Sequence, residues 1–307
     1  MIYIMKFGGV KMAIMKGIDY KLKVKPAYFQ LIHRSAYEGP CRLGRGEQLT
    51  REFDTRIGHE KFKVFQKTLK DVYSDSVEFL APELLTWTDE FILREEQLAK
   101  LTDALGKADI FLFDGVFHQF PASEISQNFK APVGIIGCCA STDGVAGLRN
   151  MGLEAYGYID PQDANRQFQY LRVKMALRHT RVLVVLKNDI VSKGVLSTIT
   201  NLQDLTKNLG IKFTFINAED LFEALRAYTK EQAAQAQSLA QELLDNAQDS
   251  NMTLADIEKS TKFYVVIRGL MEKHECNAFT IPCFEVCATR RFNDEFQCTP
   301  CLTHTLL

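Results

Sequence analysis

The sequence lacks the long apolar segments of membrane proteins and secreted precursors. Residues 1–20 are largely apolar, but Lys6, Lys11 and Lys16 interrupt them. A signal peptide needs an unbroken apolar run of about 7–15 residues and a small-residue cleavage site, and a membrane-spanning helix needs about 20 apolar residues. Neither pattern is present, so we expect a cytoplasmic protein with no membrane partner.

The sequence also lacks an excess of charge of either sign. Its formal net charge is −1, and Lys and Arg are spread along the chain rather than gathered in a stripe that could follow a phosphate backbone. Nucleic acid is therefore not expected as a partner. Internal repeats and low-complexity segments are absent as well. The composition, 46% hydrophobic and 24% charged, is typical of a globular protein.

The 307 residues are too many for one small domain and suit two of ordinary size. From residue 27 onwards, short apolar runs typical of buried parallel strands alternate with longer segments of helical period. The expected strands are 28–33, 109–113, 133–138, 155–159, 182–186, 213–216 and 278–284. The expected helices are 61–73, 94–105, 163–177, 202–209, 218–228 and 230–247. Thr253, followed by Asp256, predicts a capping box that opens one more helix, which ends near residue 272.

This alternation predicts an α/β protein of two tandem Rossmann-like domains with parallel sheets. The boundary is expected near Asp160 and Pro161. We expect an N-terminal extension at 1–26, a first α/β domain at 27–160, and a second α/β domain at 161–307 that is truncated at its C-terminal end.

Two segments have the character of ligand-binding loops. Gly134, Gly137, Gly144 and Gly147 surround a strand end and a helix start, but their spacing matches neither GxGxxG nor GxxxxGK[ST], so a nucleotide is not expected. The other segment, 33–45, follows the first expected strand, where ligands of open α/β sheets bind. Its polar residues are the candidate substrate-binding residues, the alternative being a solvated loop. They are Glu38, Arg42 and Arg45.

Five of the eight cysteines lie between residues 276 and 301. Without a secretion signal, thiols are expected rather than disulfides. Cys283, Cys287, Cys298 and Cys301 have a spacing near that of a zinc ribbon. However, Cys283 lies in an apolar run, where a cysteine acts as a small hydrophobic residue. We therefore predict that these four thiols do not converge on one metal ion.

Glu285 directly follows the apolar run 278–284, which would place a carboxylate at the carboxyl edge of a parallel sheet. Carboxylates in that position bind divalent metals or act as bases. The alternative is a surface glutamate that ends a strand.

Three stretches together resemble the fucose/arabinose isomerase superfamily. The first is RVLVVL followed by GIKFTFINAEDLFEAL, and the second is MTLADIEKSTKFYVVIRGLMEKHECNAFTIPCFE, a long helix that leads into a strand and a carboxylate. The third is TPCLTHTLL, similar to the Pro-Cys-Leu helix start of the family. The resemblance covers residues 132–307, whereas residues 1–130 match only in general α/β character.

The resemblance implies a metal-dependent aldose–ketose isomerase that works through an ene-diol, with manganese or another divalent metal as cofactor and a small sugar as substrate. Glu285 is similar to the first metal-binding and catalytic carboxylate of the family. The second carboxylate and the metal-binding histidine come after Leu307, and His304 stands where the family has a packing residue. We therefore expect a truncated chain that is inactive alone, with a second copy of itself, in a homo-oligomer, as one candidate partner. The alternatives are a two-lobed sugar-binding or regulatory module without catalysis, and an inert remnant.

Overall fold

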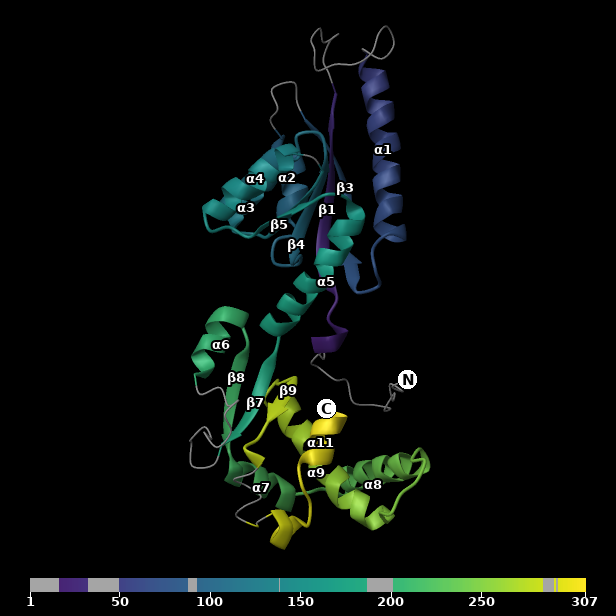
Figure 1. Ribbon diagram of the computed structural model, residues 1–307, viewed down its shortest axis with the longest axis vertical. Helices are drawn as coiled ribbons and strands as arrows, with labels where there is room; N and C mark the ends of the chain where they lie inside the picture. Colours follow the sequence, from purple (N-terminus) through teal and green to yellow (C-terminus); the bar gives the residue numbers. More distant parts are fainter. Residues whose placement is uncertain are drawn as a thin grey trace. The chain divides into compact units, whose positions relative to one another are not determined.

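The computed structural model describes residues 17–32, 50–87, 93–137, 139–186, 201–283, 290 and 292–307, without the side chains of residues 139–141, 292 and 293. The chain divides into two compact units, residues 20–175 and residues 176–307 together with 1–19. Each unit contains a parallel sheet with helices (Figure 1), so the predicted Rossmann-like α/β fold is confirmed. Within the described ranges, no helix combines the length and the apolar character that crossing a membrane requires.

The sheet of the unit at residues 20–175 is built around its first strand. Its strands are β1 Leu22–Leu31, β2 Val77–Phe79, β3 Glu83–Trp87, β4 Ile110–Gly115, β5 Val133–Ile136 and β6 Ala155–Tyr158. Their order is β2-β1-β4-β5-β6, and β3 also pairs with β1 on the side of β2. Every pairing is parallel, as strands joined by helical crossovers require.

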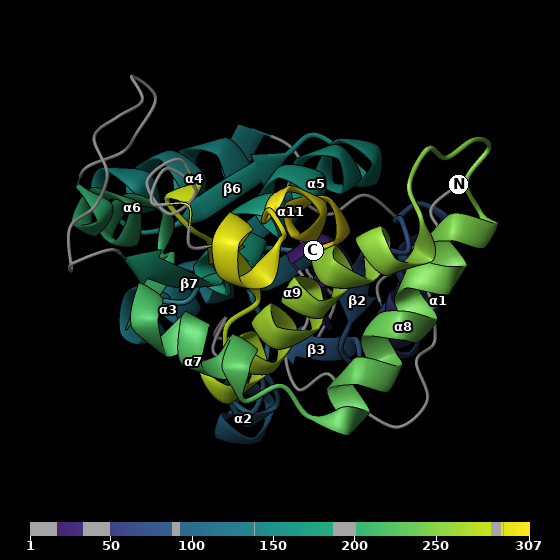
Figure 2. The same cartoon turned by 90° about the horizontal axis from the view of Figure 1, so that it is seen from below.

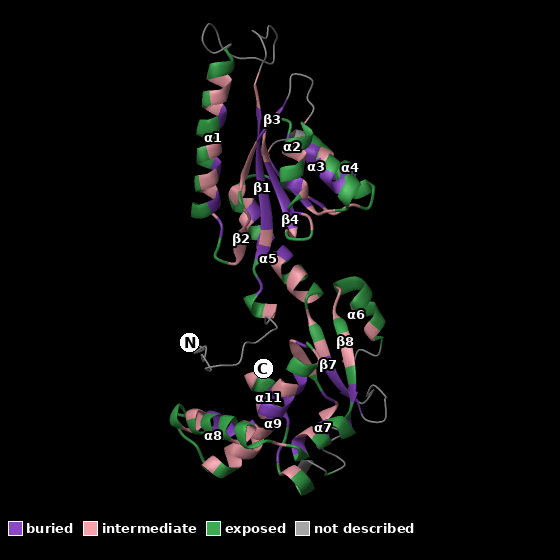
Figure 3. Cartoon of the chain, turned by 180° about the vertical axis from the view of Figure 1, so that it is seen from behind, coloured by how far each residue is buried: buried purple, intermediate pink, exposed green. Residues whose placement is uncertain are grey.

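Helices cover both faces of this sheet. They are α1 Arg51–Asp71, α2 Glu95–Thr102, α3 Gln119–Phe129, α4 Cys139–Asn150 and α5 Pro161–Arg178. Buried residues of α1 and α5 pack with one face of the sheet, and those of α2, α3 and α4 pack with the other. Most of β1 is therefore buried between the two layers, while the outer side of α1 is exposed (Figure 3).

The first strand begins inside the segment that the sequence assigned to an N-terminal extension, because β1 starts at Leu22. Lys25 and Pro26 interrupt the apolar residues of this strand, so its first half is not evident from the sequence. Pro26 lacks the N–H group that a continuous ladder needs, and the pairing on this side of β1 is split between β2 and β3. Lys25 Nζ lies 2.8 Å from the Ala81 carbonyl oxygen between those strands and 2.9 Å from Glu83 Oε1, so the buried charge is paired.

The other unit holds a three-stranded parallel sheet in the order β8-β7-β9. Its strands are β7 Arg181–Leu186, β8 Lys212–Asn217 and β9 Ala278–Thr280. Its α-helices are α6 Leu202–Leu209, α7 Ala218–Arg226, α8 Lys230–Asp245, α9 Leu254–Lys273 and α11 Cys301–Leu306. The unit also contains the 3₁₀ helix η1 Gly17–Asp19 and the π-helix η3 Phe292–Phe296. α8 and α9 lie side by side (Figure 2). The capping box predicted at Thr253 and Asp256 is present at the start of α9.

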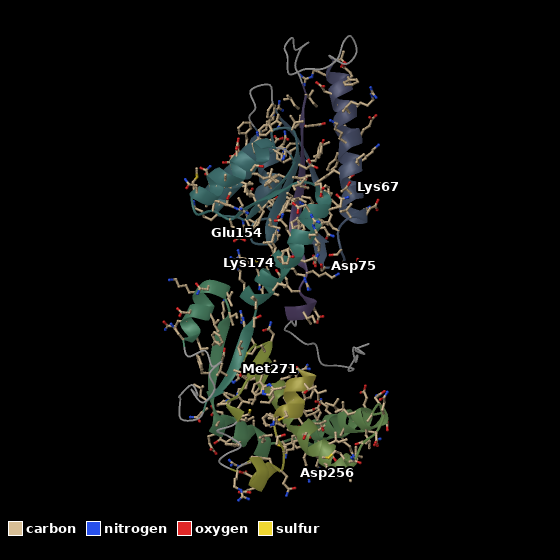
Figure 4. All side chains as sticks on the ribbon, viewed as in Figure 1. Lys67, Asp75, Glu154, Lys174, Asp256 and Met271 are labelled. Atoms are coloured by element: carbon tan, nitrogen blue, oxygen red, sulfur yellow. The ribbon has the colours of Figure 1, made fainter. Side chains whose placement is uncertain are left out.

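The two units meet in sequence at residues 175 and 176, within α5, rather than near Asp160 and Pro161. The first three turns of α5 belong to the core of the preceding unit, because Phe168 and Leu171 are buried there. Further along, Lys174 Nζ lies 2.9 Å from Glu154 Oε1 and ties the helix to the end of α4 and the start of β6 (Figure 4). A proline after an apolar strand thus starts a helix of the same unit.

Candidate functional site

The four residues that the sequence singles out lie outside the described residues. They are Glu38, Arg42, Arg45 and Glu285. β1 ends at Leu31 and β9 ends at Thr280, so these candidates follow strands that the structure does describe. Among the described residues, the polar groups that gather at the carboxyl edge of the first sheet form a candidate site.

That edge contains a topological switch point between β1 and β4. From β1 the chain crosses through α1 to β2 and β3, whereas from β4 it crosses through α3 over the opposite face to β5. The two neighbouring strands therefore send their connections in opposite directions. Ligands of open α/β sheets bind beyond the carboxyl ends of strands at such a point.

Asp114 lies at the end of β4, beside Tyr28 of β1. Its Oδ1 accepts a hydrogen bond from the Gly115 N–H at 2.7 Å. Burial raises the pKa of Asp114. The hydrogen bond from Gly115, His118 in its protonated form and the ammonium of Lys61 only partly oppose this effect. Burial and the charge of Asp114 together raise the pKa of Tyr28 to about 12.

His118 is buried at the start of α3. Its Nε2 lies 2.7 Å from the Ile136 carbonyl oxygen at the end of β5, and since a carbonyl only accepts, Nε2 carries the proton. Burial lowers the pKa of His118, while its backbone hydrogen bonds and the charge of Asp114 act in the opposite direction. The imidazole is therefore neutral at pH 7.

Gly115 fixes the sharp turn that follows Asp114. Its φ is 109°, and a Cβ at this position would lie 2.2 Å from the Phe29 carbonyl oxygen. Only glycine is compatible with both conditions. The chain consequently leaves the sheet after Gly115 and turns into α3.

Close packing of α1 on β1 brings a cation to the same edge. The buried side chain of Gln30 donates to Thr86 Oγ1 at 2.8 Å, and a Cβ on Gly58 would lie only 1.6 Å from Gln30 Oε1. Glycine at this position lets the helix approach the strand. Lys61, one turn further along α1, is exposed and acts electrostatically on Asp114.

The sequence contains a signal for this site that was not among the predicted candidates. In IFLFDG a carboxylate directly follows an apolar run, the same pattern that singled out Glu285. A carboxylate, a neutral imidazole and an ammonium group gather at one sheet edge. Such a set can accept and donate hydrogen bonds to a hydroxylated small molecule.

The late cysteines occupy different environments. Cys298 is buried in the core with Cys276, Cys283 is half-buried against that core, Cys301 is exposed, and Cys287 lies outside the described residues. His304 stacks on Phe279 with ring centroids 5.2 Å apart. In the part of the chain that the structure describes, no three His, Cys, Asp or Glu side chains gather as a metal site.

The glycine-rich segment also has a packing role. A Cβ on Gly134 of β5 would lie 2.5 Å from the ring of Tyr158 on the neighbouring strand, so this glycine makes room for the buried tyrosine. Gly137 ends the same strand with a φ of 118°.

The chain matches no protein-family model and no curated protein sequence.

Proposed function

We propose that this protein binds a small sugar at the carboxyl edge of β1 and β4, with Asp114 accepting hydrogen bonds from sugar hydroxyl groups. The observation that carries the proposal is the raised pKa of Asp114 at a topological switch point. A buried carboxylate whose charged form is unfavourable in free energy is typical of a functional site. The proposal includes a cytoplasmic location, which the sequence favours.

The neighbouring groups support a polyhydroxylated ligand. Asp114 supplies an acceptor, and the exposed ammonium of Lys61 supplies donors from α1. His118 is held by Ile136 in a fixed ring orientation and contributes no charge at pH 7. A few convergent polar groups of this kind fix the orientation of a small ligand.

Calorimetric titration with L-fucose and L-arabinose, in buffer without divalent metal, tests the proposal. We expect binding of at least one of these sugars, and Asp114→Asn should weaken it by about tenfold or more, because hydrogen bonds to charged groups contribute about 1.5–3 kcal/mol. Asp103→Asn, at an exposed position beyond α2, serves as the control. Equal affinities of the Asp114→Asn and wild-type proteins would rule out this site.

A second candidate function is a part in manganese-dependent aldose–ketose isomerisation, with Glu285 as one metal-binding and catalytic carboxylate and with no turnover expected from this chain alone. What supports it is the order of elements in the segment that resembles the isomerase superfamily. A long helix, α9, leads into the strand β9, and α11 begins at Cys301 within TPCL. These are the helix, the strand and the helix start on which the resemblance rests.

Thermal unfolding with and without MnCl₂ tests this candidate. A metal that binds only the folded protein raises its stability by mass action, so manganese should raise the Tm of the wild-type protein. Glu285→Gln should remove the shift, whereas Glu231→Gln, on the exposed side of α8, should retain it. A manganese shift that persists in Glu285→Gln would assign the metal to other residues.

A further inference from the structure

Tyr28 lies beside the carboxylate of the candidate site, on the same face of the sheet. The pairing of β1 with β4 sets Tyr28 against Asp114, and neighbouring strands of a sheet lie about 4.8 Å apart. Tyr28 and Leu112 are buried in one core, beneath α1 and α5. Asp114 follows Leu112 by two residues along β4, so its side chain projects from that face as well.

Helix α1 holds the ring of Tyr28 in place. Its centroid lies 5.6 Å from that of Phe65 and 6.5 Å from that of Phe62. Phe65 is itself buried in the core between the helix and the sheet. The phenol is therefore fixed before any ligand arrives, and little freedom of this side chain remains to be lost on binding.

Tyr28 and Asp114 have complementary hydrogen-bonding groups that do not meet. Asp114 Oδ1 accepts from the Gly115 N–H, and none of the described residues donates to its Oδ2. Within the described structure the Tyr28 hydroxyl also has no hydrogen-bond partner, although it is not enclosed by protein. Burial and the charge of Asp114 raise the pKa of Tyr28 to about 12, so the phenol keeps its proton at pH 7 and can donate.

The two groups end at different heights above the sheet, because a tyrosine side chain is longer than an aspartate side chain by the length of its ring. Two hydroxyl groups on neighbouring carbon atoms of a sugar are offset from each other in a similar way. Each hydroxyl group can both donate and accept a hydrogen bond. Such a pair therefore satisfies the carboxylate and the phenol at the same time.

We infer that Tyr28 and Asp114 together bind a vicinal diol of the sugar, with Asp114 accepting from one hydroxyl group and Tyr28 donating to its neighbour. This inference rests on the proposed function and narrows the substrate class to sugars in which such a pair is free. A sugar that lacks either hydroxyl group makes only one of the two contacts. Tyr28 is thus a specificity-determining residue.

Tyr28→Phe removes the hydroxyl group and retains the ring that packs against Phe62 and Phe65. Calorimetry with L-fucose or L-arabinose, whichever binds more tightly, should show binding weakened about three- to tenfold, the contribution of one hydrogen bond between neutral groups. Tyr73→Phe is the matched control. Tyr73 is also within the electrostatic reach of Asp114, but its hydroxyl group is fully enclosed, so its removal should leave the affinity unchanged.

Derivatives of the same sugar that each lack one hydroxyl group test the diol itself. The derivative without the hydroxyl that Tyr28 contacts should bind equally to the wild-type and Tyr28→Phe proteins. The derivative without the hydroxyl that Asp114 contacts should bind equally to the wild-type and Asp114→Asn proteins. We expect the two missing hydroxyl groups to be neighbours, and positions that are not neighbours would overturn the inference.

The wild-type protein alone provides a second measurement, which does not depend on the folding of any variant. Removal of either of two neighbouring hydroxyl groups should weaken binding more than removal of any other. A single dominant hydroxyl group, or two that are not neighbours, would contradict the diol.

The outcomes separate the inference from the proposed function. Binding that depends on Asp114 but not on Tyr28 would refute the inference and keep the proposed function. Absence of binding for both sugars would refute the two together. Equal losses in Tyr28→Phe and Tyr73→Phe would show that the phenols act through the charge of Asp114 rather than by contact, and the inference would be wrong.

Discussion

Asp114 can be replaced by asparagine with little change in shape, because both side chains offer an oxygen to the Gly115 N–H at 2.7 Å. The substitution removes a charge that burial disfavours, as the raised pKa of Asp114 shows. We expect Asp114→Asn to stabilise the protein at pH 7 by about 1 kcal/mol, a typical gain when a residue that serves function at the expense of stability is replaced. Binding residues commonly carry such a cost.

The sign of the pH dependence follows from the direction of the shift. The folded protein holds the Asp114 proton more tightly than the unfolded chain does. The free energy that the buried charge takes from the stability of the protein is therefore fully present above the pKa that Asp114 has in the folded state. It disappears as the pH falls through that pKa towards the ordinary value of 3.8. Circular-dichroism melts should thus show a higher Tm for Asp114→Asn at pH 7 and a smaller difference near pH 4. A lower Tm at pH 7 would contradict the prediction.

Gly58 and Gly147 offer a matched pair of glycine-to-alanine substitutions within helices. A Cβ at Gly58 would lie 1.6 Å from Gln30 Oε1, whereas a Cβ at Gly147 meets nothing within 4 Å. Alanine is favoured over glycine in helices by about 1 kcal/mol. We expect Gly147→Ala to stabilise by up to that amount and Gly58→Ala to destabilise by about 1–3 kcal/mol. Urea unfolding would measure both, and a stable Gly58→Ala protein would mean that α1 does not pack closely on β1.

At the scale of helices and strands, the sequence predicts elements well where their apolar period is long or their ends carry caps. The expected helix at 202–209 coincides with α6, and the capping box at Thr253 opens α9. The sequence pattern did not predict β2, which is only three residues long, or α3, which carries Pro121 in its first turn. A short strand shows no period, and a proline that is tolerated in the first turn resembles a helix breaker.

The cap of α9 gives a prediction at this scale. Thr253 accepts a hydrogen bond from the Asp256 N–H, and Asp256 accepts one in return from the Thr253 N–H. Thr253→Ala should destabilise the protein by about 1 kcal/mol. Thr253→Ser keeps the hydroxyl and should be close to neutral. Equal losses in the two variants, measured by thermal unfolding, would show that the hydroxyl is not what stabilises the helix start.

At the scale of the whole molecule, the class of fold could be predicted from the alternation of strands and helices, but the division between the units could not. The sequence after Asp160 shows only a helix, and its assignment depends on where Phe168 and Leu171 pack. The candidate site could not be predicted from the sequence for the same reason. Asp114 and Lys61 come from distant segments, and only the packing of α1 on β1, the neighbour of β4 in the sheet, brings them to one edge.

The two units have separate cores, which share no buried residue among those described. Leu221 and Leu112 are fully buried, one in each unit. We expect Leu221→Ala, which costs about 2–5 kcal/mol, to raise hydrogen exchange in β7 and α9 while β4 and β5 stay protected. Leu112→Ala should do the reverse. A rise of exchange in both units with either variant would show one cooperative structure.

The pairing of β1 with β4 has a consequence for how the protein forms. Lys23 of β1 donates its N–H to Asp109, just before β4, across a separation of 86 residues, and Arg181 and Asn277 in the other unit are separated by 96. At a synthesis rate of about 5–20 residues per second, β1 leaves the ribosome several seconds before its central partner exists. During that interval an apolar strand has both edges open. We therefore expect the nascent chain to depend on chaperones until residue 115 has emerged, and refolding from denaturant to be slow and prone to aggregation.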